Sequence, residues 1–201
     1  MAKHVDYYVS LNSPWTFLGS KRFEVIARKY GVDVTIWPVD FGSVFSVSGG
    51  LPLPKRAPQR QVYRMMELKR WREHLGIKDM KLEPKFFPSN ELLAAKCVIA
   101  LREQGRMADA IKVAHAVLAA IWTEDKNAGD PATLQAIIAG CGLDAAAVIK
   151  SGEAPAMAEK READTKRAIE QGVFGAPSFV IDGEIFWGQD RLDFVERKLA
   201  G

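Results

Sequence analysis

The residues best suited to do chemistry lie near the start of the chain, where Ser13-Pro14-Trp15 follows an apolar run. A serine before a proline fits the N-cap of a helix, because its hydroxyl accepts a hydrogen bond from a free N–H of the first turn. The same position, at the carboxyl end of a strand and beside a helix N-terminus, also stabilises an anion. A bound thiolate would suit it, with the Ser13 hydroxyl donating to the sulfur. The residues alone leave both interpretations open.

Two further motifs, near the other end of the chain, could bind a peptide-like ligand. In Gly175-Ala176-Pro177 the proline could merely give up one ladder donor, or a cis proline could leave the Ala176 backbone free to pair with an extended ligand. Trp187-Gly188-Gln189-Asp190-Arg191 precedes the last helical pattern. Asp190 there could cap the helix with Arg191 solvated, or the two charges could hold the ammonium and carboxylate of an amino-acid group.

The histidines and cysteines encode neither a metal site nor a disulfide framework. His4, His74 and His115 are scattered and have no partners at metal-ligand spacing. Cys97 and Cys141 are the only cysteines, and neither lies in the serine motif, which argues strongly against disulfide exchange. We therefore expect no metal and a reducing compartment.

The composition is that of an ordinary globular protein of 201 residues, long enough to form a core without disulfides or metal. Lys and Arg total 28 against 25 Asp and Glu, and a net charge of +3 is too weak to indicate nucleic acid or an anionic membrane. The chain shows no signal-peptide pattern and no apolar run of about 18 residues. These features predict a cytoplasmic protein that acts on small molecules, with no nucleic-acid or membrane partner.

The elements that must position the motifs follow a simple order. Residues 5–10 and 32–39 are β-branched or aromatic and flank a helical pattern that ends at Gly31, so they predict a βαβ unit. Residues 41–58 are rich in Gly, Ser and Pro, which predicts a long loop. Helical patterns then follow one another, with predicted helices at 59–75, 91–104, 106–123, 131–139, 144–150 and 155–171.

The last thirty residues change character. Two β-rich runs, 178–181 and 184–187, flank Asp182-Gly183, which is the signature of a hairpin with a type I′ turn. Residues 190–199 then form an amphipathic helical pattern. Strand, helix, strand, long helical stretch, hairpin and helix is the predicted order.

A family resemblance rests on four motifs that run in order along nearly the whole chain: Ser13-Pro14-Trp15, Phe87-Pro88-Ser89-Asn90, Gly172 to Pro177, and Trp187 to Leu192. Together they resemble the 2-hydroxychromene-2-carboxylate isomerases and the kappa-class glutathione transferases, within the DsbA-like group. The resemblance implies an α/β fold in which a thioredoxin-like domain, residues 1–50 and 172–201, is interrupted by an all-helical insertion domain, residues 51–171. It also implies a homodimer.

The resemblance further implies glutathione as a cofactor bound between the two domains. Ser13 would be the catalytic residue that faces the sulfur, and Ala176 with cis-Pro177 would pair with the cysteinyl unit. The γ-glutamyl end would be held by Trp187, Gly188, Gln189, Asp190 and Arg191. Asn90 would face the second substrate, a small aromatic carboxylate.

The loop after the second strand departs from the isomerases that this chain resembles. Those relatives carry a lysine there for the substrate carboxylate, but residues 41–50 of this chain hold no cation. Lys55, Arg56 or Arg60 could supply the charge, and their spacing does not choose among them.

Three functions follow from the resemblance. The leading one is the glutathione-dependent conversion of 2-hydroxychromene-2-carboxylate, or a related aromatic ring-fission product, to trans-o-hydroxybenzylidenepyruvate by reversible thiolate addition. Glutathione conjugation or peroxide reduction, as in the kappa transferases, is the alternative, and it would consume glutathione. A third possibility is a module that binds glutathione without turnover.

Overall fold

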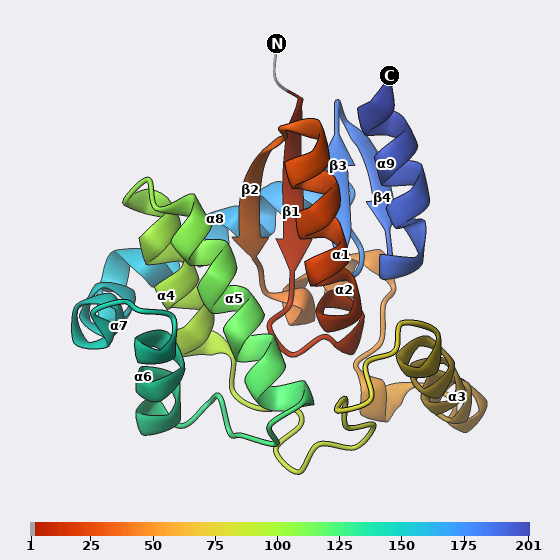
Figure 1. Ribbon diagram of the computed structural model, residues 1–201, viewed down its shortest axis with the longest axis horizontal. Coiled ribbons are helices and arrows are strands. Elements are labelled where there is room, and N and C mark those ends of the chain that lie inside the picture. Colours follow the sequence, from red (N-terminus) through yellow and green to blue (C-terminus); the bar gives the residue numbers. More distant parts are fainter. Residues whose placement is uncertain (1–2) are drawn as a thin grey trace.

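The computed structural model describes residues 3–201 and is built around a four-stranded sheet (Figure 1). The strands are β1 (His4–Val9), β2 (Asp33–Pro38), β3 (Ser178–Ile181) and β4 (Glu184–Trp187), in the order β2-β1-β3-β4. The first two are parallel, β3 is antiparallel to β1, and β4 is antiparallel to β3. The carboxyl ends of β1 and β4 therefore meet the amino end of β3 at one edge of the sheet.

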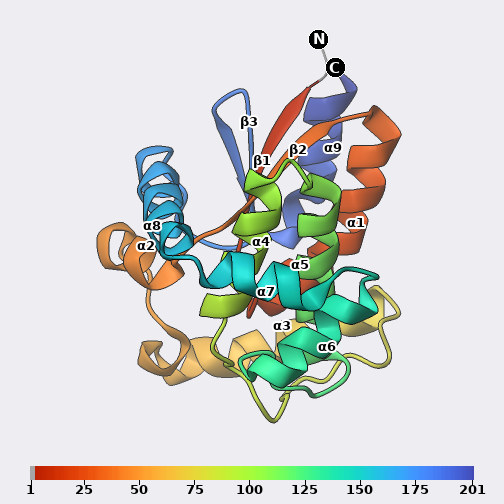
Figure 2. The same ribbon diagram turned by 90° about the vertical axis from the view of Figure 1, so that its left-hand side faces the viewer.

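Helices cover both faces of the sheet, because residues alternate between the two faces along each strand. Tyr7 points to the face covered by α1 (Pro14–Tyr30) and α9 (Leu192–Ala200), where its ring stacks on Phe179 with centroids 5.1 Å apart. Tyr8 packs on the opposite face, in a smaller cluster with residues of α2 (Phe41–Ser48) and α8 (Pro155–Glu170). Figure 2 shows the two helix pairs on opposite sides of the strands.

The remaining helices form the stretch between β2 and β3, as the sequence predicts. They are α3 (Pro58–His74), α4 (Leu92–Glu103), α5 (Met107–Trp122), α6 (Pro131–Gly140) and α7 (Ala145–Glu153). Helices α4 and α5 pack beside β2 and share the main hydrophobic core with it (Figure 1). The predicted fold class, a thioredoxin-like fold with a helical insertion, is confirmed. The division at residues 50 and 171 stays a prediction, since α8 from the predicted insertion also covers the sheet.

The prediction of a loop over residues 41–58 is wrong for its first half. Residues 41–48 form α2, and a short 3-10 helix spans Leu53–Lys55. The Asp40 carboxylate accepts from the Gly42 N–H at 3.0 Å and so caps the helix, while Phe41 and Val44 are buried one turn apart. The Gly and Ser residues that suggested a loop are small residues in this short helix and its left-handed end at Gly49.

The local turn signals agree with the sequence-based predictions. Asp182 and Gly183 have φ values of 52° and 80°, the left-handed pair that a type I′ turn requires. The Ala176–Pro177 peptide is cis, as the resemblance implies, and Phe87–Pro88 is cis as well. Within residues 3–201 no helix is long and apolar enough to cross a membrane.

Candidate functional site

Ser13 lies at the carboxyl-end edge of the sheet and begins α1. Its Oγ accepts a hydrogen bond from the Thr16 N–H at 3.2 Å, so its predicted role as an N-cap is confirmed. The side chain is half-buried, and within residues 3–201 its hydroxyl hydrogen has no acceptor. The hydroxyl can therefore cap the helix and still donate to a ligand. The second role remains a prediction.

The segment before β3 reaches the same edge. Tyr8 pairs with Ser178, and Ser178 pairs with Trp187, so the two C-terminal motifs lie side by side across the sheet. The Gly188 N–H donates to the Pro177 carbonyl at 2.9 Å and joins them directly. Among the described residues the Ala176 N–H donates to no acceptor. This free donor fits the strand-like pairing that a glutathione backbone requires.

Trp187 forms a wall beside this free backbone. Its indole lies against Gly175 so closely that a Cβ on the glycine would come within 2.3 Å of Nε1. The ring also packs on Phe174, with centroids 4.8 Å apart, yet 49% of Trp187 stays exposed. A glycine before Ala176 is therefore what allows the indole to flank the site.

In the turn after Trp187, Gln189 is buried, whereas the two charged residues that follow it are exposed. Gly188 has φ 108°, a value that favours glycine. Gln189 is only 2% exposed, and Arg22 donates to its side-chain oxygen at 2.7 Å and to its carbonyl at 3.1 Å. The structure thus places the Gln189 side chain in the contact with α1 and away from solvent. We infer that Gln189 holds the turn in place against α1.

Asp190 and Arg191 are exposed at the surface of this turn. Arg191 Nη2 lies 3.4 Å from Asp190 Oδ2. The alternative in which Asp190 caps the last helix is wrong, because α9 begins at Leu192 with Arg191 at its N-cap position and no side-chain cap. The two charges form an exposed ion pair with each other, and the role toward a zwitterionic group that the resemblance implies stays a prediction.

Asn90 lies between two residues, Ser89 and Glu91, that both form hydrogen bonds with Asn12, the residue before Ser13. Its own Oδ1 accepts from the Leu92 N–H at 3.0 Å, and the residue is exposed. The preceding Ser89 exchanges two hydrogen bonds with Asn12, N–H to Oδ1 at 3.0 Å and Nδ2 to carbonyl at 2.8 Å. Asn90 also lines a cavity of about 350 Å³. The residues around this cavity are Lys85, Phe86, Phe87, Pro88, Ser89, Asn90, Asn127 and Gly129.

Glu91 is a positioning residue that the sequence analysis missed. One carboxylate oxygen accepts from the Asn12 N–H and from the Ser10 hydroxyl, both at 2.9 Å. Burial raises the pKa of Glu91, although these hydrogen bonds and Arg161 at 3.6 Å oppose the rise. The loop that leads into Ser13 is therefore held by a buried carboxylate. In the sequence, the one feature that could have pointed to Glu91 and its partner Asn12 is that each lies next to a predicted site residue. Asn12 precedes Ser13, and Glu91 follows Asn90.

Within residues 3–201 no hydrogen bond or ion pair joins Lys55 or Arg56 to the Ser13 turn. Lys55 is exposed at the end of the 3-10 helix. Arg56 is half-buried, and its Nε donates to the Leu51 carbonyl at 2.8 Å. Within residues 3–201 neither forms a hydrogen bond or ion pair with the other predicted site residues. Their role toward a carboxylate stays a prediction.

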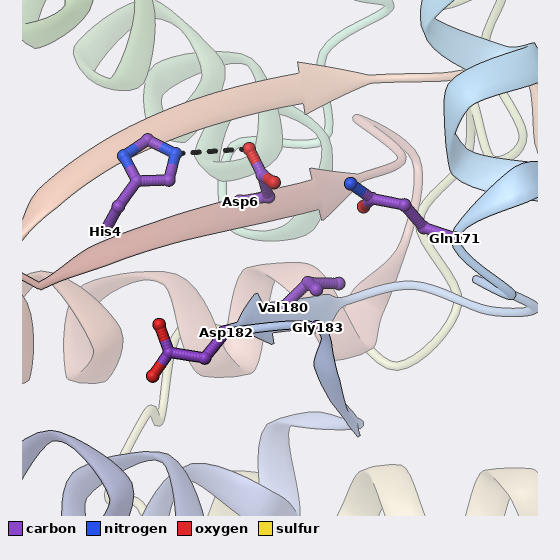
Figure 3. Close-up of a pocket in the computed structure, with 6 residues that line it drawn as sticks. All are labelled: His4, Asp6, Gln171, Val180, Asp182 and Gly183. Carbon is purple, nitrogen blue, oxygen red and sulfur yellow. Dashed lines mark hydrogen bonds and ion pairs between the residues drawn. The ribbon is translucent and has the colours of Figure 1, made fainter.

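A separate cavity of about 360 Å³ lies at the other end of β1 (Figure 3). His4 Nε2 is 3.2 Å from the Asp6 carboxylate there, and Asp182 borders the cavity from the hairpin. Asp6 is already satisfied by Trp37 at 2.7 Å and Arg167 at 3.0 Å. Although burial acts to raise it, these hydrogen bonds hold the pKa of Asp6 below its usual range. The cluster ties the sheet to α8 through the ion pair between Asp6 and Arg167.

The remaining residues that could bind a metal or carry a thiol lie apart from one another in the described part of the chain, residues 3–201. No group of three His, Cys, Asp or Glu residues within it is arranged to hold a metal ion. Cys97 and Cys141 are free and buried, and burial raises the pKa of both thiols, that of Cys97 to about 12. A raised pKa disfavours the thiolate, the nucleophilic form of each side chain.

Comparison with known proteins defines the class to which this fold and site belong. The DSBA-like thioredoxin domain matches residues 4–200, so the chain belongs to the DsbA-like thioredoxin family. Two relatives within it are 2-hydroxychromene-2-carboxylate isomerases. The enzyme of Sphingobium xenophagum is 31% identical over 99% of both chains, and that of Pseudomonas putida is 29% identical over 98% of this chain and 94% of its own.

A solved structure supports the same grouping. The selenomethionine form of a 2-hydroxychromene-2-carboxylate isomerase superposes with a TM-score of 0.80 at 26% identity, covering 98% of this chain and 94% of that one. The resemblance read from the four sequence motifs is thus confirmed, and the chain is a member of the isomerase branch of the family.

Proposed function

We propose that the protein is a glutathione-dependent isomerase that converts 2-hydroxychromene-2-carboxylate, or a closely related ring-fission product, to trans-o-hydroxybenzylidenepyruvate. The observation that carries the proposal is the meeting of three motifs at one edge of the sheet: Ser13 at a helix N-terminus, the free Ala176 N–H, and the turn Trp187 to Arg191. The names of its relatives support the reaction. The site residues support the glutathione part.

Each motif fits one part of a glutathione molecule. The free N–H of Ala176 matches the backbone of the cysteinyl unit, as an added strand would. The exposed charges of Asp190 and Arg191 match the ammonium and carboxylate of the γ-glutamyl end. The Trp187 indole lies against Gly175, next to Ala176 in the chain, and would flank the bound peptide. When bound, glutathione supplies a thiolate that adds reversibly to the substrate, which permits ring opening and rotation before the sulfur leaves.

The chain itself contributes a site that favours a thiolate. The N-terminus of α1 carries partial positive charge from its free N–H groups. The Ser13 hydroxyl, whose oxygen accepts from Thr16, is free to donate its hydrogen to a sulfur. Both interactions stabilise the charged form, so both lower the pKa of a bound thiol. The loop before Ser13 stays fixed because Asn12 is held by Glu91 and Ser89.

The second substrate would lie on the side of the Ser13 turn that faces residues 87–90. Phe87 packs on Trp122 with ring centroids 4.9 Å apart, and the Trp122 indole donates to the Asn12 carbonyl at 3.2 Å. An aromatic carboxylate placed there would meet an apolar ring and the exposed amide of Asn90. The homodimer that the resemblance implies stays a prediction.

A glutathione transferase or peroxidase is the alternative function, and one assay separates the two. Purified protein is mixed with 2-hydroxychromene-2-carboxylate and glutathione while substrate absorbance and free thiol are both followed. We expect conversion only when glutathione is present, with the free thiol unchanged after many turnovers. Loss of one thiol per product would favour the transferase, and conversion at the same rate without glutathione would contradict the proposal.

A further inference from the structure

Arg64 is a cation on the inner face of α3 that lacks an acidic partner. It lies one turn before Leu68, which is fully buried, and is itself half-buried. Its Nη1 has a single hydrogen-bond contact, with the weakly accepting Met65 sulfur at 3.5 Å. Within residues 3–201 no carboxylate forms an ion pair with it. A partly desolvated and unpaired guanidinium is costly, and such groups commonly serve an anionic ligand.

The surroundings of Arg64 make the position still less favourable for a bare cation. The first turn of α3 contains no acidic residue and no side-chain cap. Arg60 lies one turn before Arg64 on the helix, and like charges at this spacing repel each other. Burial, and then the nearby charge of Arg56, lower the pKa of Arg64 to about 10. An anion at this place would remove the mutual repulsion.

Arg64 is connected to the Ser13 turn through a chain of aromatic contacts. Its Cζ lies 5.4 Å from the centroid of the Phe87 ring, and that ring packs on Trp122. Trp122 in turn donates to the carbonyl of Asn12, the residue before Ser13. The guanidinium therefore lies over the ring on which an aromatic substrate would pack.

We infer that Arg64 is the specificity-determining residue that binds the carboxylate of the aromatic second substrate, in place of Lys55 or Arg56. This inference rests on the proposed function and identifies the cation that this function needs. The planar fork of Arg64 binds both carboxylate oxygens, while Phe87 contacts the aromatic ring. Arg56 already donates to Leu51, and Lys55 is exposed to solvent.

The test compares Arg64→Gln and Arg64→Lys with a matched control on the same helix. Arg70→Gln removes an exposed arginine whose partner is Glu67. The measurements are binding of 2-hydroxychromene-2-carboxylate by quenching of tryptophan fluorescence, KM and kcat for that substrate, and the glutathione dissociation constant. Thermal melting checks that each variant folds.

We expect Arg64→Gln to weaken substrate binding and raise KM roughly 10- to 100-fold, the effect of one lost charge-assisted pair. Arg64→Lys keeps the charge without the fork and should fall between Arg64→Gln and the wild type. Arg70→Gln should bind the substrate and turn it over as the wild type does. The glutathione dissociation constant should be the same in all the variants and in the wild type. A folded Arg64→Gln with normal substrate binding would overturn the inference, and so would a loss of glutathione affinity, which would assign Arg64 to the glycine carboxylate of glutathione.

The proposed function and this inference fail in different ways. A wild-type protein that binds the substrate but does not isomerise it contradicts the proposed function. In that case substrate binding still tests the inference: weaker binding by Arg64→Gln than by the wild type supports it, and equal binding overturns it. A wild type that turns over normally, with Arg64→Gln equal to it in KM, contradicts the inference alone.

Discussion

At the scale of single residues, the N-cap role of Ser13 does not compete with the donor role that we propose for it. The oxygen of its hydroxyl accepts from the Thr16 N–H, and the hydrogen of the same hydroxyl remains available to a ligand. A cysteine in this position would be a redox nucleophile, whereas a serine near neutral pH stays protonated and can only donate or accept. Under the proposed function, the reactive sulfur is therefore that of the bound glutathione.

The substitution Ser13→Ala separates the two roles. Loss of the N-cap should reduce the free energy of unfolding by about 0.5–2 kcal/mol. Loss of the hydrogen bond to sulfur should raise the pKa of the bound glutathione thiol by roughly one to two units and slow turnover near pH 7. The thiol pKa in the wild-type complex and in the Ser13→Ala complex is read from the thiolate absorbance of bound glutathione as pH is varied.

Ser151→Ala provides the control for that substitution. Ser151 also lies in a helix, where its Oγ donates to the Ala147 carbonyl at 2.9 Å, and it takes no part in the site. The control should leave the bound thiol pKa unchanged. If Ser13→Ala lowers the melting temperature but gives the same thiol pKa as wild type, the hydroxyl serves only the helix.

The two cysteines should be dispensable. Burial raises the pKa of both thiols, and neither side chain lies in the site motifs. Cys97→Ala and Cys141→Ala, alone and together, should retain wild-type kcat/KM when assayed with glutathione. A folded variant without turnover would show that a protein thiol takes part in the reaction.

At the scale of elements, the hairpin and the segment before it form the side of the site that we propose binds glutathione. The type I′ turn at Asp182-Gly183 aligns β4 with β3, which places Trp187 beside Gly175. Ladder pairing and the Gly188 to Pro177 hydrogen bond then hold the exposed residues at one edge. The geometry of the site thus depends on backbone contacts more than on the identity of its side chains.

Gly175→Ala should disturb this arrangement directly. The added Cβ would lie 2.3 Å from Trp187 Nε1, so the indole must move, at a cost of about 1–3 kcal/mol typical of overpacking. We expect weaker glutathione binding and a changed tryptophan emission spectrum. Gly140→Ala is the matched control, since a Cβ there meets nothing within 4 Å. Equal glutathione affinity in Gly175→Ala and wild type would argue against Trp187 as a wall of the site.

Most elements could be predicted because their signals are local. Ser13 before Pro14, Gly31 at a helix end and Asp182-Gly183 in a turn each follow from the conformations that those residues favour. Helix α2 could not be found in this way, because its stability comes from burial of Phe41 and Val44 against the sheet and α8. Tertiary packing there outweighed the turn-forming tendency of the glycines and serines.

The candidate site was predictable only where its residues form recognisable motifs. Ser13, Ala176 and the turn from Trp187 to Arg191 lie in such motifs. Glu91 and Arg64 do not, since their importance depends on contacts with residues distant in the sequence, Asn12 and Phe87. A mostly buried carboxylate and a half-buried cation without an acidic partner become visible only when the neighbours of each are known.

At the scale of the whole molecule, the site lies where the sheet edge meets the helical stretch. The Asn12, Ser89 and Glu91 hydrogen bonds join the two parts next to Ser13. The hydrophobic core is also continuous between the sheet and helices α4 and α5. A ligand bound at this junction would contact both parts and should stabilise the fold as a unit.

The most direct test of the account is the melting temperature of the wild-type protein in the presence of glutathione. A ligand that binds only the folded state adds RT ln(1 + [L]/Kd), about 2.7 kcal/mol at a hundredfold excess over Kd. We predict a melting temperature that rises steadily through millimolar glutathione, and a smaller rise with glutathione whose sulfur is methylated, because that sulfur cannot become a thiolate. A melting temperature that stays flat at millimolar glutathione would contradict the central claim.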